Sequence, residues 1–170
     1  MLASYFIHFA NYNIWANNKI YSACGNLSEQ AYLKARPSFF GSIHKTLNHI
    51  LVADMIWMER FLSEAGAPKM LDAILFEDFN GLNDARQQHD EKILDFAISL
   101  TDRQLSEILE YSDVNGIPHD VPLSICLGHF FNHQTHHRGQ VHGMLSSEAE
   151  SPPALDLIYY TLEKLEGKNG

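Results

Sequence analysis

Basic residues are scarce in this sequence. Lysine and arginine together number 12, against 21 aspartates and glutamates, and the formal net charge is −9. Proteins that bind DNA or RNA neutralise phosphates with clustered lysines and arginines, whereas the few basic residues here are spread along the chain. The composition therefore argues against a nucleic acid as the partner.

The sequence also lacks an apolar run long enough to span a bilayer, so we expect no membrane partner. Its first residues lack the basic segment and the small-residue cleavage site of a secretory signal. We therefore expect a cytoplasmic protein. The only two cysteines, Cys24 and Cys126, fall in separate helical segments. A disulfide between them is not expected in a reducing compartment, and we interpret both as small buried hydrophobic residues.

Helical periodicity runs through most of the chain. Hydrophobic residues make up 45% of the 170 residues and charged residues 19%, which is typical of a globular protein. A chain of this length buries about 70% of its unfolded surface, so we expect one domain over residues 1–170. Apolar spacing, capping residues and breakers predict four long helices and a short C-terminal one. Their ranges are 2–24, 41–65, 81–100, 122–147 and, for the last, 155–165.

A different pattern precedes the fourth long helix. Two β-prone runs, 108–111 and 117–121, flank Asn115-Gly116, a dipeptide favoured in tight hairpin turns. Pro118 restricts the second strand to a sheet edge. The predicted fold class is therefore all-α: a four-helix bundle with a short β-hairpin excursion before the fourth helix and a short C-terminal helix.

Two predicted helices differ in how their polar residues are distributed. The helix at 41–65 is apolar around much of its circumference, which favours a central position or a homodimer interface. Its polar interruptions are His44, Asn48, His49 and Asp54, and periodicity does not decide which of them point inward. By contrast, residues 83–92, with His89, are polar on most faces, so we expect a solvent-exposed edge there.

Histidine is the one residue type in excess, with ten in the chain, and it is the commonest metal ligand. Four of them, His129, His133, His136 and His137, fall within nine residues. On a helix these four and Gln140 lie within an arc of about 100°. His133 and His137 are four residues apart, so their Cβ atoms are about 5–6 Å apart and both imidazoles can reach one metal ion.

Helix geometry limits how many ligands this face can supply. With a rise of about 1.5 Å per residue, His129 and His137 are about 12 Å apart along the axis. One ion with metal–nitrogen bonds of about 2.0–2.1 Å cannot readily hold both. The ligand pair is therefore His129 with His133 or His133 with His137, or less favourably His133 with His136. A third ligand must come from elsewhere in the chain.

Asn13 and Asn17 are four residues apart, beside aromatic residues of the first predicted helix. Their amides either bond to neighbouring helices or solvent, or line a polar pocket. Both interpretations are open at this point.

Four segments carry a family resemblance. They are Tyr12-Asn13-Ile14-Trp15-Ala16-Asn17, Ser42-Ile43-His44-Lys45-Thr46-Leu47-Asn48-His49-Ile50, Asn132-His133-Gln134-Thr135-His136-His137-Arg138-Gly139-Gln140 and Pro153-Ala154-Leu155-Asp156-Leu157. Together they span nearly the whole chain, and on their ordered combination the sequence resembles the DinB family. The resemblance implies a four-helix bundle, often dimeric, of metal-binding proteins related to thiol-dependent transferases and isomerases. It also implies a metal site formed by His49 with His133 and His137.

Three neutral imidazoles would leave a divalent ion with its full double charge and one or more open positions, which is typical of catalytic sites. Zinc, nickel and iron all suit imidazole ligands. By resemblance to the thiol-dependent branch, we expect an S-transferase or isomerase. In that reaction the sulfur of a small thiol cofactor attacks an electrophilic small-molecule substrate.

The remaining candidate residues have roles in substrate binding and proton transfer. Substrate-binding candidates are Asn13, Asn17 and Gln140, with His129 at the pocket mouth, and proton-transfer candidates are His136 and Asp54. Two alternatives stay open. One is a metal-dependent hydrolase, which uses hydroxide and needs a general acid that no glutamate supplies at a supported position. The other is a non-catalytic, stress-related, metal-binding dimer.

Overall fold

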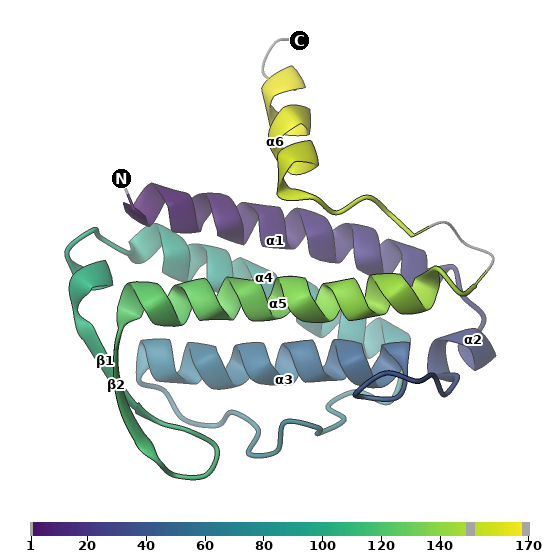
Figure 1. Ribbon diagram of the computed structural model, residues 1–170, viewed down its shortest axis with the longest axis horizontal. Coiled ribbons are helices and arrows are strands. Elements are labelled where there is room, and N and C mark those ends of the chain that lie inside the picture. The colour runs from purple at the N-terminus through teal and green to yellow at the C-terminus, as the bar shows by residue number, and fades with distance from the viewer. Residues whose placement is uncertain (1, 149–151, 168–170) are drawn as a thin grey trace.

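The computed structural model describes residues 2–148 and 152–167. Four long helices lie side by side in it (Figure 1): α1 (Leu2–Gly25), α3 (Ile43–Leu62), α4 (Phe79–Ser99) and α5 (Leu123–Leu145). α1 and α3 each pack against both α4 and α5. Three short helical elements complete the set: α2 (Glu29–Leu33), the 3₁₀ turn η1 (Gln104–Ser106) and α6 (Leu157–Glu166). The predicted four-helix bundle is confirmed.

Side-chain caps explain where two of the long helices begin. Ser42 Oγ accepts a hydrogen bond from the Lys45 N–H at 3.1 Å, and Asp78 Oδ1 accepts one from the Gly81 N–H at 2.8 Å. α3 ends at Leu62, before the predicted residue 65, where Ser63 turns into the left-handed region with φ 53°. α2 lies between the predicted helices 2–24 and 41–65, where the sequence predicts no helix. Its five residues are too few to produce a periodic signal.

The predicted hairpin is also confirmed. Strands β1 (Ile108–Ser112) and β2 (Pro118–Pro122) pair antiparallel, with Tyr111 opposite His119. Their connection, residues 113–117, is longer than the two-residue turn that Asn-Gly favours. Asp113 Oδ1 accepts hydrogen bonds from the backbone N–H groups of Asn115 (2.9 Å) and Ile117 (3.0 Å). Gly116 has φ 80°, a conformation that suits glycine.

The interior of the bundle consists of two hydrophobic clusters separated by a polar layer. One cluster includes Ile20, Leu47, Leu82 and Leu145; the other includes Phe6, Met58, Ile93 and Phe130. On every long helix the polar layer occupies the turns between the two clusters. We call it the buried polar network, and each member is at most 3% exposed: Asn13, Asn17, Asp54, Arg86, Asp90, Gln134 and Arg138.

The network corrects the expectation for residues 83–92. Arg86 and Asp90, predicted to lie on a solvent-exposed edge, are buried, and His89 is half-buried. Arg86 Nη1 donates to Asp54 Oδ2 at 2.5 Å, and its Nη2 lies 3.0 Å from Asp90 Oδ1. Arg86 and Asp90 can be buried because each has a partner of opposite charge.

α6 stands away from the bundle on the side of α1 (Figure 1). Tyr160 anchors it, because this buried ring packs near Tyr12 and Trp15. Trp15 Nε1 also donates a hydrogen bond to Glu163 Oε2 at 2.6 Å. Within residues 2–148 and 152–167, no helix combines the length and apolar character needed to cross a membrane.

Candidate metal centre

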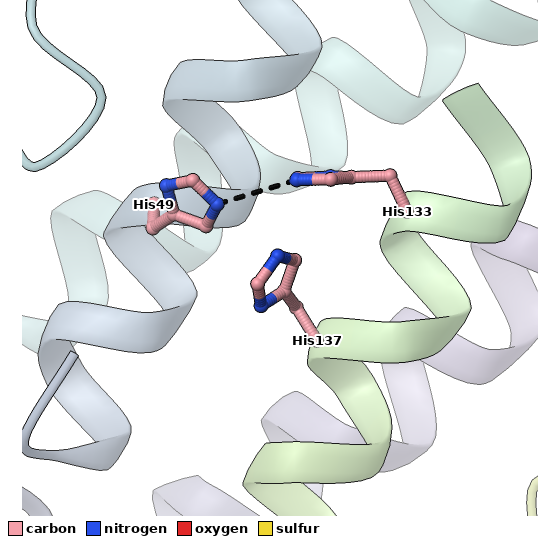
Figure 2. A group of neighbouring side chains, drawn as sticks. All are labelled: His49, His133 and His137. Atoms are coloured by element: carbon pink, nitrogen blue, oxygen red, sulfur yellow. Dashed lines mark hydrogen bonds between the residues drawn. The ribbon is translucent and has the colours of Figure 1, made fainter. Parts of the chain in front are cut away.

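Three histidines from two helices meet at one point. His49 extends from α3, and His133 and His137 extend from successive turns of α5 (Figure 2). Each offers a ring nitrogen, and these nitrogens all lie within 4.8 Å of one another. The structure therefore brings together the three histidines that the family resemblance implied. We call them the three-histidine group.

Hydrogen bonds on the far side of two rings aim their other nitrogens at this point. His49 Nδ1 lies 2.7 Å from the carbonyl oxygen of Leu71, and His137 Nδ1 lies 2.9 Å from Gln140 Oε1. Both oxygens only accept, so each Nδ1 carries the proton and donates it. The Nε2 lone pairs of His49 and His137 are then free to bind a cation.

Burial keeps these rings neutral. Desolvation, with a smaller contribution from the neighbouring histidines, lowers the pKa of His133 to about 3. Desolvation also lowers the pKa of His137 to about 4 and lowers that of His49. Neutral imidazole is the form that ligates metal, so the three rings present lone pairs near neutral pH.

The spacing suits a tetrahedral ion. Two ligand nitrogens at bond lengths of 2.0–2.1 Å are about 3.4 Å apart in tetrahedral geometry, and Nε2 of His49 lies 3.3 Å from Nε2 of His133. No Asp, Glu or Cys of the described chain joins the group. The residues present therefore fit a divalent metal ion held by three imidazoles.

Aromatic rings border the three-histidine group on two sides. Phe40 stacks on His49 with centroids 3.9 Å apart and meets His137 edge-on at 5.5 Å. On the other side, His129 lies 5.8 Å from His133 and 5.2 Å from the Trp57 ring. His129 is exposed, so it lies beside the group at the surface. Sequence patterns offered no sign of Phe40 or Trp57 in this role.

Gln140 and His136 lie next to His137. The Gln140 amide is shared by two histidines, because Oε1 accepts from His137 and Nε2 lies 3.1 Å from His136 Nε2. The His136 ring is exposed, and its centroid is 4.8 Å from that of His137. In this arrangement Gln140 orients a histidine of the group, whereas the sequence suggested contact with substrate.

Asn13 and Asn17, expected to bind substrate, are instead engaged in the buried polar network. Both donate to Asp90 Oδ1 at 3.0 Å, and both side-chain carbonyls accept hydrogen bonds from Arg138 Nη1. Of the two interpretations left open by the sequence, these contacts support amides that join neighbouring helices.

Asp54, the other proton-transfer candidate, belongs to the same network. Its Oδ2 pairs with Arg86, and burial raises the pKa of this carboxyl to about 7 although Arg86 opposes the shift. His44, the alternative histidine of α3, is also accounted for, because its Nδ1 lies 3.2 Å from the Tyr32 hydroxyl. Neither residue is a member of the three-histidine group.

Comparisons with known proteins agree with the fold. The family model described as "DinB family" matches residues 1–166. "Protein DinB" of Bacillus subtilis (strain 168) is 27% identical, with 91% of this chain and 93% of that protein covered. The crystal structure of a DinB-like protein from Bacillus cereus ATCC 10987 superposes with a TM-score of 0.64 at 18% identity, covering 86% of this chain and 94% of that one. At this identity the structural likeness concerns the fold alone.

Proposed function

The chain belongs to the DinB family, and we propose that it is a metal-dependent enzyme that transfers the sulfur of a small thiol to an electrophilic substrate. The observation that carries the proposal is the convergence of three neutral imidazoles without a carboxylate. A divalent ion held by such ligands keeps its double charge, and four-coordinate geometry leaves it one open position. Zinc, nickel and iron all suit this ligand set.

Bound at these histidines, the ion would supply the means to deprotonate a thiol at neutral pH. The chain's own residues then take the remaining roles. His49, His133 and His137 hold the ion, and Gln140 and the Leu71 carbonyl keep two of the rings in the correct tautomer. Exposed His136 is placed to take up the thiol proton and pass it to water.

The reaction balances without an oxidant or reductant. The thiol loses its proton, the sulfur forms a new bond to the electrophilic carbon, and the leaving group departs with the electrons of the broken bond. Hydrolysis of an ester by the same group would need a general acid. No carboxylate of the described chain belongs to the group, so exposed His136 would have to supply that acid, whereas transfer of a thiolate to a substrate with a stable anionic leaving group needs none.

Two measurements test this function. Elemental analysis of protein purified without added metal, compared with His133→Ala and His137→Ala, should show stoichiometric metal only in the parent. His119→Ala, on the hairpin, serves as the matched control and should retain metal. Stoichiometric metal in both site variants would end the proposal.

The second measurement is turnover of the metal-loaded protein. Small thiols are assayed with 1-chloro-2,4-dinitrobenzene, beside a panel of nitrophenyl esters, and thiol-dependent release of chloride that His133→Ala abolishes is the expected result. Turnover of esters alone would favour the hydrolase. No turnover in either panel would favour a non-catalytic metal-binding protein.

We also propose a homodimer that forms through the face of α5 opposite the three-histidine group. A cavity of about 920 Å³ lies there between α1, α5 and residues 154–157. Its rim includes Tyr5 and Ile125, which are 54% and 62% exposed. α6, on the side of α1, adds further exposed apolar residues, namely Ile158, Tyr159, Leu162 and Leu165. Exposed apolar surface of this kind is typical of protein interfaces.

We propose that the protein is cytoplasmic, and its two thiols are consistent with a reducing compartment. Cys24 and Cys126 are both unpaired and buried.

A further inference from the structure

A second, smaller cavity lies beside Gln140, the residue that supports His137 of the three-histidine group. Its volume is about 460 Å³, which is within the range of small-molecule sites. One wall is the loop that joins α2 to α3, and the other is the end of α5. We call it the Phe39 pocket, and its lining residues are Arg36, Pro37, Ser38, Phe39, Gln140, Gly143, Met144 and Ser147.

Each wall of the Phe39 pocket is connected to a histidine of the group through other side chains. On the α5 side, Gln140 lines the pocket and accepts the hydrogen bond from His137 Nδ1. On the loop side, the Phe39 ring lies 4.9 Å from Phe40, which stacks on His49. A molecule in the pocket is therefore separated from His137 by Gln140, and from His49 by Phe39 and Phe40.

The pocket's chemistry favours an uncharged, apolar occupant. Phe39 is 87% exposed, the largest value among the large hydrophobic residues of the described chain. Met144 offers a thioether, which packs well against aromatic rings. Arg36 is the one charged residue in the lining, and Glu148 already pairs with it at 2.6 Å. The Arg36 Nε has no partner but is buried out of a ligand's reach, so a charged ligand would gain no accessible unpaired partner, whereas a flat apolar ring would cover Phe39.

The loop wall is held in place before any ligand arrives. The Arg36 N–H donates to the Gly41 carbonyl at 2.7 Å, and the Gly41 N–H donates to the Ser38 carbonyl at 3.0 Å. Gly41 has φ 81°, which residues with a side chain rarely adopt. The Phe39 pocket is therefore largely preformed, as small-molecule sites usually are.

We propose that the Phe39 pocket binds an uncharged aromatic group of the electrophilic substrate, while the reacting carbon lies outside the pocket, on the side of Gln140 that faces the three-histidine group. The identification of this ligand as a substrate rests on the proposed function. It narrows the substrate class to electrophiles that carry a neutral aryl group next to the reacting carbon, and it makes Phe39, Gly143 and Met144 the residues that determine specificity.

Binding can be measured without turnover. Met144 lines the pocket, and its methyl group serves as the reporter in protein labelled with ¹³C-methyl methionine. The probe is 1,3-dinitrobenzene, a neutral aromatic compound that lacks a leaving group. Titration of metal-free and zinc-loaded protein should shift the Met144 resonance to saturation, while those of Met55 and Met58 in α3 stay in place.

Two glycine variants provide the contrast. A side chain at Gly143 enters open space, because an added Cβ would meet nothing within 4 Å, so Gly143→Leu should fill the pocket and weaken probe binding at least tenfold. Gly128→Leu is the matched control, since Gly128 has equally open surroundings on α5 but lines the other cavity. Its probe affinity should equal that of the parent.

Three results would overturn the proposal: no shift of Met144, equal shifts of all three methionines, or unchanged affinity in Gly143→Leu. Because the metal-free protein is measured as well, failure of the metal or thiol-transfer proposal leaves the binding result intact. Conversely, specific probe binding without any turnover would count against the proposed function alone.

Discussion

Replacement of Gln140 by leucine should weaken metal binding without weakening the fold. The substitution removes the acceptor that lies 2.9 Å from His137 Nδ1, so the ring loses the contact that sets its tautomer and orientation. Loss of such an outer partner typically lowers metal affinity 10- to 100-fold. That range corresponds to about 1.4–2.8 kcal/mol, somewhat more than the about 1 kcal/mol of an ordinary neutral hydrogen bond.

The assay is competition for zinc between the protein and a chromogenic chelator at pH 7.5. Thermal unfolding of the metal-free proteins checks the fold, and Gln140 is only half-buried, so its loss should change the melting temperature little. Gln140→Glu is the matched control. A carboxylate keeps an acceptor beside His137 and makes the ring a more basic ligand, so its zinc affinity should equal or exceed that of the parent.

Two outcomes would refute this reasoning. If Gln140→Leu binds zinc as tightly as the parent, the contact with His137 does not support a ligand. If Gln140→Glu binds as weakly as Gln140→Leu, the acceptor oxygen is not the property that matters.

Three further predictions concern the interior and the surface. Asp54→Asn removes one of the two carboxylates that pair with buried Arg86 and leaves Asp90 in place, so the free energy of unfolding in urea should fall by about 1.5–3 kcal/mol; a loss under about 1 kcal/mol would contradict a buried pair. Burial lowers the pKa of His89 to about 3. Between about pH 6.5 and pH 3 the unfolded chain therefore takes up a proton at His89 and the folded protein does not. The stability that neutral His89 contributes is complete above about pH 6.5 and is lost as the pH falls toward 3. At pH 5 this loss is about 2 kcal/mol. Between pH 7 and pH 5, metal-free His89→Gln should therefore lose about that much less stability than the metal-free parent. Equal losses in the two proteins would show that His89 does not cause the pH dependence. Ile125→Asp should convert the proposed dimer to monomer in light scattering, whereas Ile117→Asp, on the hairpin, should not, and a persistent dimer would exclude this face.

Local signals predicted most of the secondary structure because their physical causes act within a few residues. Ser42 and Asp78 are residue types that favour helix N-caps, and their side chains accept the hydrogen bonds that begin α3 and α4. The Asn115-Gly116 dipeptide placed the hairpin correctly although its connecting loop is longer than expected. The sequence did not predict α2, because about one and a half turns of helix are too short to show a hydrophobic period.

Long-range pairing explains why the polar part of α4 was misjudged. Arg86 binds Asp54 on α3, and Asp90 binds Asn13 on α1, across separations of 32 and 77 residues. A charged side chain looks solvent-facing in a periodic pattern because its partner is far away in sequence. For the same reason the sequence left the roles of Asn13 and Asn17 undecided, and only the packing of the helices showed their partners.

By itself, the sequence determined that His133 and His137 lie one turn apart on the same face, because the rise and turn of a helix follow from the backbone alone. Spacing also excluded His129 and His137 as joint ligands of one ion. Only the tertiary structure decided the rest of the centre. His49 reaches His133 across 84 residues because α3 packs against α5. The support of His49 comes from the Leu71 carbonyl, a backbone group that no side-chain pattern can reveal.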